Sequence, residues 1–135
     1  MKIEDILCLD ATFKDHYESK SVLQDISKFY SACNYCKQKY NNAGISTGSW
    51  GCGAFWCDTA HKFLQQLVSA KVNNVKLSYS TFGDQYYCKN LIKLFNCVIK
   101  YKPKISDLYK LIIEYKGKTD REFHKYLKEK LGDEF

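Results

Sequence analysis

Glycine is concentrated in one short segment of this chain, just before residues that have the spacing of a helix. Four of the seven glycines among the 135 residues lie between positions 44 and 53, and Asp58 follows as a candidate N-cap. Glycines before a helix N-terminus allow backbone N–H groups to point at an anion, and the helix dipole favours negative charge there. The segment therefore predicts a loop that can hold a diphosphate, although a tight turn would produce the same Gly-x-Gly pattern.

Hydrophobic periodicity around this loop predicts alternating strands and helices, and hence an α/β fold. The contiguous apolar residues near the start are typical of a strand buried on both faces of a parallel sheet. The later segments show helical spacing with candidate caps, followed by a short apolar strand that ends at residues 81–84. The expected order is a strand at 3–9, a helix at 22–40 capped by Ser21, a glycine loop at 41–53, a helix at 58–70 capped by Asp58 and a strand at 75–79.

The C-terminal part of the chain is expected to be helical. Apolar spacing indicates a helix around residues 91–98, and Pro103 separates it from another at 105–115, which ends before Gly117. Thr119 and Glu122 have the spacing of a capping box and open a final helix.

Length and composition indicate one compact domain spanning residues 1–135. The sequence has no run of about 18 apolar residues, and its first residues lack the basic start, apolar block and cleavage site of a secretory signal. We therefore expect an intracellular protein with no membrane partner; nucleus and cytoplasm are not distinguished.

Lysine dominates the positive charge. Of the 21 basic residues Arg121 is the only arginine, and the net charge is +6. Arginine makes the bidentate contacts that favour base recognition, so we expect no sequence-specific nucleic-acid partner. Ten basic and five acidic residues lie between Lys100 and Lys130. This basic stretch is either a solvated helical face or a patch that attracts polyanions.

The seven cysteines are an odd number in a chain without an export signal, so we expect reduced thiols rather than a disulfide framework. Cys33 and Cys36 form one CxxC pair, and Cys52 and Cys57 flank four residues, which together suggest a zinc site. The alternative is that Cys33 and Cys36 pack as small apolar groups near the end of a helix. We favour the alternative and expect neither a metal nor a cofactor.

The most specific pattern consists of four segments: Ile6-Leu7-Cys8-Leu9-Asp10-Ala11, Thr47-Gly48-Ser49-Trp50-Gly51-Cys52-Gly53-Ala54-Phe55, Thr81-Phe82-Gly83-Asp84 and Asp107-Leu108-Tyr109-Lys110-Leu111. In this order and at this spacing they closely resemble the C-terminal part of the catalytic domain of the poly(ADP-ribose) glycohydrolase family. The resemblance covers residues 3 to about 116. It implies a partial macrodomain-like α/β fold, with a short, mostly parallel sheet flanked by helices and a helical C-terminal region. It also implies binding of ADP-ribose and hydrolysis of the ribose–ribose O-glycosidic bonds of poly(ADP-ribose).

The resemblance also implies which residues contact the ligand. Phe82 is similar to the phenylalanine that packs against the sugar of the bound nucleotide, although a core aromatic at a strand end would give the same pattern. The chain departs from the family pattern at Ser49, commonly asparagine, and at Trp56 and Cys57, commonly two glycines. The implied diphosphate loop, which would contribute mostly backbone N–H groups, comprises Ser49, Trp50, Gly51, Cys52, Gly53, Ala54 and Phe55.

The catalytic signature of the family, a triple glycine followed by Gln-Glu-Glu, does not occur in these 135 residues. Glycosidic cleavage needs a carboxylic acid to protonate the leaving oxygen and a second group to stabilise the oxocarbenium-like centre. The six glutamates are isolated from one another, so we expect no catalytic residue in this chain. Asp10 and Asp84, at expected strand ends, are better placed for ligand contact, but we favour an N-cap or turn role for them.

Three functions are compatible with these patterns. The first is a truncated poly(ADP-ribose) glycohydrolase-like protein that retains at most ADP-ribose binding, unless a complementary chain supplies the catalytic half. The second is a non-catalytic protein-interaction module with a basic helical face, and the third is a small zinc protein. If the first is correct, a parallel sheet cut in this way should expose an apolar edge and an apolar face.

Overall fold

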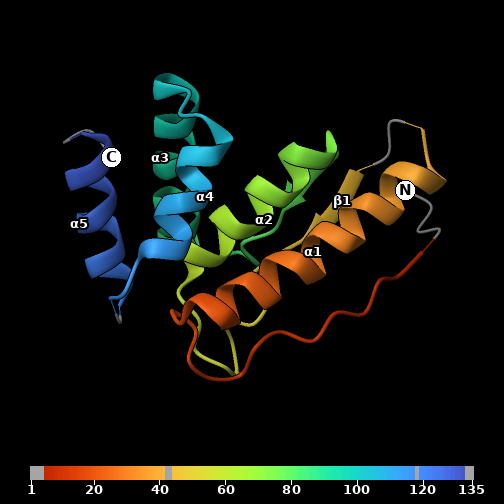
Figure 1. The fold of residues 1–135 in the computed structure, drawn as a ribbon, viewed down its shortest axis with the longest axis horizontal. Coiled ribbons are helices and arrows are strands. Elements are labelled where there is room, and N and C mark those ends of the chain that lie inside the picture. The colour runs from red at the N-terminus through yellow and green to blue at the C-terminus, as the bar shows by residue number, and fades with distance from the viewer. Residues whose placement is uncertain (1–4, 42–43, 118, 133–135) are drawn as a thin grey trace.

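The protein is described here by a computed structural model that covers residues 5–41, 44–117 and 119–132. Figure 1 shows α1 and α2 crossing the middle of the molecule, with α3, α4 and α5 gathered at one end. The elements in chain order are α1 (Ser19–Lys39), β1 (Gly44–Thr47), α2 (Thr59–Asn73), β2 (Lys76–Tyr79), α3 (Gln85–Tyr101), α4 (Ile105–Glu114) and α5 (Asp120–Leu131).

The sheet consists, within the described residues, of the parallel pair β1 and β2, which α2 connects. Ile45 lies opposite Leu77 in the register, and both strands alternate between exposed and half-buried residues. Ile45 and Leu77 therefore point to the same face, where they pack against Phe29 of α1 and Ala70 of α2. The expected α/β class with a short parallel sheet flanked by helices is confirmed.

The opposite face of the sheet is uncovered and polar. It carries Gly44, Ser46, Lys76 and Ser78, all of them exposed. The expectation of an exposed apolar sheet face is therefore wrong for these two strands, because only the half-buried positions of each strand carry large apolar side chains. Exposed apolar surface lies instead beside the outer edge of β2.

The strand expected at residues 3–9 is not present at residues 5–9, and residues 3 and 4 lie outside the described part of the chain. This segment runs extended along α1, where Asp5 accepts a hydrogen bond from Lys39 at 2.7 Å and Asp10 pairs with Lys28 at 3.0 Å. Ile6 is 80% exposed. The contiguous apolar residues are therefore not buried on two faces. Among the residues that the structure describes, the first strand is β1, inside the expected glycine loop.

The expected helices are confirmed, and three of the expected caps form. Asp58, Asp84 and Thr119 accept backbone hydrogen bonds from the residues three positions later, at 2.5, 2.9 and 3.2 Å. The prediction of a Ser21 cap is wrong, because α1 begins at Ser19 with Glu18 as its N-cap residue. Ser21 therefore lies in the first turn of the helix.

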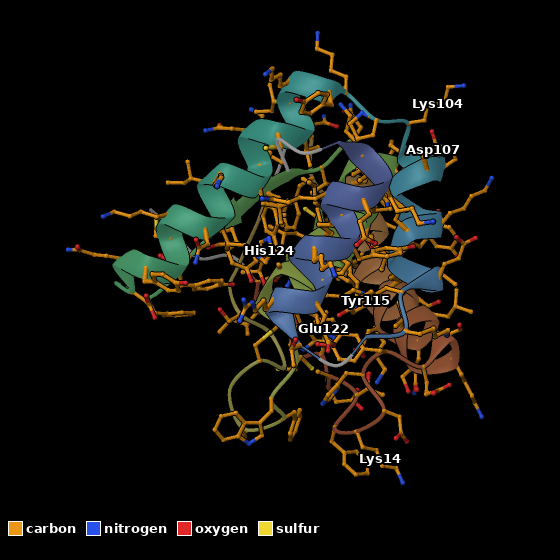
Figure 2. All side chains as sticks on the ribbon, turned by 90° about the vertical axis from the view of Figure 1, so that its left-hand side faces the viewer. Lys14, Lys104, Asp107, Tyr115, Glu122 and His124 are labelled. Carbon is orange, nitrogen blue, oxygen red and sulfur yellow. The ribbon has the colours of Figure 1, made fainter. Side chains whose placement is uncertain are left out.

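The α2 helix is buried on nearly every side because α1, α4, α5 and β2 all pack against it. His61 lies at the centre of an aromatic cluster, with the ring centroids of Phe123 at 4.8 Å, Tyr17 at 5.4 Å and Tyr115 at 5.8 Å. Figure 2 shows Tyr115 beside α5, in the segment that joins α4 to α5. The cluster fixes the C-terminal helices on α2.

The buried His61 is held in its neutral form. Its Nε2 donates to the carbonyl of Ile112 at 3.0 Å, and its Nδ1 accepts from the amide of Gln65 at 2.9 Å. Burial, together with the positive charge of Lys62, lowers the pKa of His61 from 6.5 to about 4.

Protein stability should therefore fall on acidification because of His61. In the unfolded chain the imidazole binds a proton near pH 6.5, but in the folded chain only near pH 4. The contribution of His61 to the free energy of unfolding is therefore complete above pH 6.5 and is lost as the pH falls to about 4. We expect a loss of about 3 kcal/mol across this window. Chemical denaturation of wild type and His61→Gln at a series of pH values measures it. The same pH dependence of the free energy of unfolding in both proteins would contradict the role given to His61.

Candidate functional site

The segment between β1 and α2, residues 48–58, is a series of turns closed by its own backbone. Trp50 N–H donates to Gly48 O at 2.7 Å, Cys52 N–H to Ser49 O at 3.0 Å and Cys57 N–H to Gly51 O at 3.3 Å. The N–H groups of Trp50 and Cys52, both in the expected diphosphate loop, are therefore used within the loop itself. The loop therefore has a defined conformation that its own backbone hydrogen bonds hold.

Two glycines are required by close packing in this loop. Gly51 has φ +76°, and a Cβ built on it would lie 2.7 Å from Ala11 Cβ. A Cβ on Gly48 would lie 2.5 Å from the ring of Phe82 and 3.0 Å from Ser80 O. The glycines therefore permit the approach of the N-terminal segment on one side and of Phe82 on the other.

The Trp50 side chain turns into the protein. Its indole N–H donates to Leu9 O at 2.9 Å, and its ring lies 4.9 Å from Lys62 Nζ and 6.1 Å from the ring of Phe29. Trp50 therefore anchors the loop to the N-terminal segment and to α1. The Trp50 ring therefore does not face the outer surface of the loop.

The Ser49 side chain begins a chain of hydroxyl groups. Ser49 Oγ donates to Tyr87 Oη at 3.1 Å, and Tyr87 Oη lies 2.8 Å from Tyr79 Oη. Burial raises the pKa values of both tyrosines, so both hydroxyls remain protonated and can donate. Through this chain Ser49 links the loop to α3 and β2.

Phe82 is exposed rather than part of the core. It is 80% exposed and has a left-handed φ of 52°, in the turn that follows β2. Its ring lies against Gly48, so the turn after β2 and the loop after β1 meet at the carboxyl ends of the parallel strands. In open α/β sheets, ligands bind at this end of the strands.

The tip of the loop projects into solvent. Gly53 and Ala54 are exposed, Phe55 is 39% exposed and Trp56 is 86% exposed with a positive φ of 57°. Trp56, one of the departures from the family pattern, thus points into solvent.

A buried ion pair supports the loop from below, and the sequence patterns did not indicate it. Lys62 Nζ contacts Asp25 Oδ2 with both side chains 3% exposed, and Asp25 Oδ1 accepts from Thr12 N–H at 3.0 Å. The Lys62 side chain also runs beneath Gly51. The available signal was the position of Asp25 among the apolar residues of α1, beside Val22, Ile26 and Phe29.

The carboxylates do not form a catalytic group within the described residues. Asp84 caps α3, as the N-cap alternative predicted, whereas Asp10 forms an exposed ion pair with Lys28. Glu18 precedes α1, Glu114 ends α4, and Glu122 and Glu129 lie on α5. Each of these glutamates is exposed.

The four motif cysteines occupy two different environments. Cys33 and Cys36 are buried in α1, next to Phe29 and Val75. Cys52 and Cys57 lie in the loop, with Cys57 Sγ at 3.1 Å from His16 Nδ1. Residues 5–41, 44–117 and 119–132 contain no cluster of three or more His, Cys, Asp or Glu suited to a metal ion. Over the same residues, no helix has the length and apolarity to cross a membrane.

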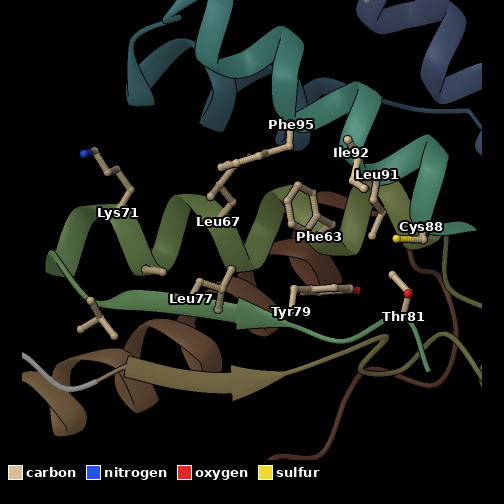
Figure 3. Close-up of a pocket in the computed structure, with 12 residues that line it drawn as sticks. Phe63, Leu67, Lys71, Leu77, Tyr79, Thr81, Cys88, Leu91, Ile92 and Phe95 are labelled. Carbon is tan, nitrogen blue, oxygen red and sulfur yellow. The ribbon is translucent and has the colours of Figure 1, made fainter. Parts of the chain in front are cut away.

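An apolar groove of about 450 Å³ lies beside the outer edge of β2. In Figure 3, Phe63 and Leu67 of α2 face Ile92 and Phe95 of α3, above Leu77 and Tyr79 of β2. Ile92 is 53% and Phe95 40% exposed. The expected apolar edge is thus present as a groove between α2, α3 and β2.

Comparisons with known proteins match this chain to one family. A family model described as "Poly (ADP-ribose) glycohydrolase (PARG), Macro domain fold" matches residues 1–89. The match includes β1, the loop, α2, β2 and Phe82, and it excludes α4, α5 and residues 107–111.

Among curated proteins, poly(ADP-ribose) glycohydrolase 1 of Arabidopsis thaliana is 30% identical over 79 residues, which is 58% of this chain and 14% of that protein. Probable poly(ADP-ribose) glycohydrolase 2 of the same plant is 34% identical over 98 residues, 72% of this chain and 18% of that protein. Poly(ADP-ribose) glycohydrolase 1 of Caenorhabditis elegans is 40% identical over 58 residues, 41% of this chain and 7% of that protein. The aligned part of the chain therefore spans at most 18% of each of these relatives.

Removing one partner of the buried ion pair should strongly destabilise the protein. Asp25→Ala leaves the Lys62 ammonium buried without its counter-ion, for which we expect a loss of about 3–5 kcal/mol in the free energy of unfolding. Asp10→Ala is the matched control, because it breaks an exposed pair and should change the free energy of unfolding little. The double variant Asp25→Leu/Lys62→Met should recover part of the loss. Equal small losses for Asp25→Ala and Asp10→Ala in urea denaturation would refute this account.

Proposed function

The chain belongs to the poly(ADP-ribose) glycohydrolase family, with its macrodomain fold, and from that membership we propose that it binds ADP-ribose units of poly(ADP-ribose). The proposed site consists of the loop at residues 49–55 and the ring of Phe82. In this proposal the chain supplies ligand binding, and the catalytic acid comes from residues outside these 135.

One observation carries the proposal: an apolar ring is held exposed beside the glycine loop. Phe82 combines 80% exposure with a left-handed backbone, and neither property favours folding. Residues in such strained conformations cluster at ligand sites, where the strain orients a side chain. The ring lies against Gly48, at the carboxyl ends of β1 and β2.

The loop offers the diphosphate a backbone site near a helix N-terminus. The N–H groups of Trp50 and Cys52 are used within the loop, so we assign the anion to those of Gly53, Ala54 and Phe55. α2 begins at Thr59, and the positive end of its dipole supports negative charge on this side of the loop. The ring of Phe82 would then pack against the sugar.

Cleavage of the glycosidic bond needs an acid that this chain does not contribute in our proposal. The described glutamates lie exposed on or beside α1, α4 and α5, and no Glu-Glu pair occurs in the sequence. A segment that carries the catalytic glutamates of the family would complete the site, and the groove beside β2 is where we expect it to dock. We also propose an intracellular location, because an odd number of cysteines does not suit a disulfide framework.

The second candidate, an interaction module with a basic helical face, is favoured by the exposure of Lys89 and Lys93 on α3 and of Lys125 and Lys128 on α5. Figure 2 shows both helices at the surface of the molecule. Such a module would bind acidic polymers in a salt-dependent manner. Its affinity for monomeric ADP-ribose would be the same in wild type and in Phe82→Ala.

ADP-ribose should bind to the purified chain and depend on Phe82. We expect Phe82→Ala to weaken binding about tenfold or more, roughly 1.4 kcal/mol, because the ring contact with the sugar is lost. Gly48→Ala should also weaken binding, since its Cβ would displace the Phe82 ring. Calorimetric titration measures both. Tyr109→Ala, which removes a half-exposed ring from α4, is the control and should bind like wild type. No heat with wild type, or equal affinity for Phe82→Ala, would exclude the proposed site.

The isolated chain should release no ADP-ribose from poly(ADP-ribose). Addition of a segment of a relative that carries the triple glycine and Gln-Glu-Glu should restore release, because it supplies the acid. Ile92→Lys/Phe95→Lys places charges in the groove and should abolish this complementation while ADP-ribose binding persists. The readout is free ADP-ribose by chromatography. Release by the 135 residues alone would show that the chain does contain the acid.

A further inference from the structure

Cys57 lies in contact with a histidine that is oriented to accept its proton. Cys57 Sγ is 3.1 Å from His16 Nδ1, and His16 Nε2 is 2.5 Å from Phe55 O. A carbonyl oxygen can only accept, so Nε2 carries the hydrogen of the neutral ring. Nδ1 is therefore the acceptor that faces the Cys57 thiol. Activated nucleophilic thiols have this arrangement of a thiol, a base and a third group that orients the base.

The other groups around Cys57 also favour its thiolate. Cys52 lies beside Cys57, because its Sγ is 3.8 Å from the carbonyl oxygen of Asp58, the residue that follows Cys57. The Cys52 thiol lowers the pKa of Cys57, and Lys62 lowers it further, against the opposing effects of burial and of the Asp25 carboxylate. Cys57 also immediately precedes Asp58, the N-cap of α2, where the helix dipole favours negative charge.

The CxxC pair is in the opposite situation. Cys33 and Cys36 face the core in α1. Burial raises the pKa of Cys33 to about 12, and the neighbouring Cys36 thiol adds to the effect. Burial also raises the pKa of Cys36. The pair that sequence spacing singles out is therefore the inert one, and the looser pair in the loop has the activating surroundings.

We propose that Cys57 and Cys52 form a peroxide-sensitive thiol pair, with Cys57 as the nucleophile, His16 as its base and Cys52 as the resolving thiol. Cys57 is only 6% exposed, which favours a small oxidant such as hydrogen peroxide over a bulky disulfide. The proposal does not depend on ADP-ribose binding.

The reaction balances with hydrogen peroxide as the only co-reactant. His16 takes the Cys57 proton, and the thiolate attacks one peroxide oxygen; the O–O bond breaks, and the leaving hydroxide receives the proton from His16 and becomes water. Cys57 is then a sulfenic acid. The Cys52 sulfur attacks the Cys57 sulfur, the S–O bond breaks, and the hydroxyl leaves as a second water with the Cys52 proton. Two thiols are oxidised to one disulfide, and one peroxide is reduced to two waters.

The test is peroxide treatment of the reduced, folded chain, followed by alkylation and peptide mass spectrometry. We expect Cys52 and Cys57 to lose alkylation together, with the mass of a disulfide, at least about tenfold faster than the exposed Cys8. Cys52→Ser should trap Cys57 as a sulfenic acid that reacts with dimedone. Cys57→Ser should leave Cys52 reduced.

The role of His16 is tested by a pH profile rather than by a single rate. His16→Gln should slow the oxidation of Cys57 about tenfold or more near neutral pH, and much less above the ordinary thiol pKa of about 8.5, where no base is needed. Oxidation of Cys33, Cys36 or Cys8 ahead of Cys57 in wild type would overturn the proposal. An unchanged pH profile for folded His16→Gln, checked by circular dichroism, would overturn the role of His16.

Discussion

The buried pair of Asp25 and Lys62 is the contact on which the rest of the loop region depends. It joins α1 to α2, and through the second carboxylate oxygen it also fixes the backbone of Thr12. Two charges removed from water must stay paired with each other and hydrogen-bonded, so the contact between α1, α2 and the backbone of Thr12 tolerates few rearrangements. Trp50 and Gly51 rest on the Lys62 side chain, which gives the glycine loop a rigid floor. A loop held in this way can present its outer surface in one defined shape.

The helices and β2 were predictable from the sequence, and β1 was not. Long periodic segments such as those of α1 and α3 bury one stripe each, and local side chains such as Asp58 and Asp84 cap their own helices. Residues 5–9 and β1 show the limit of this reasoning. An apolar run indicates a strand only if a partner is present, and within the described residues this one lies exposed along α1. β1 carries a single large apolar residue, Ile45, because only one face of the sheet is covered.

The candidate site was predictable in position but not in detail. The glycine pattern located the loop, and the structure brings Phe82 to it. Sequence reasoning could not distinguish an exposed Phe82 from a core one, because a strand end allows both. It could not foresee that Trp50 would point inward, nor that Lys62 would meet Asp25, 37 residues away. Such long-range pairs depend on how helices pack, and local sequence patterns do not reveal that packing.

The hydroxyl chain from Ser49 through Tyr87 to Tyr79 means that the loop and the groove are not mechanically independent. Tyr79 lines the groove beside β2, while Ser49 belongs to the proposed diphosphate loop. A half-buried hydroxyl that loses its partner without gaining water pays a free-energy penalty, so a shift at either end strains the other. Under the proposed function, whatever fills the groove would therefore help to set the shape of the loop, and assembly and ligand recognition would be parts of one equilibrium.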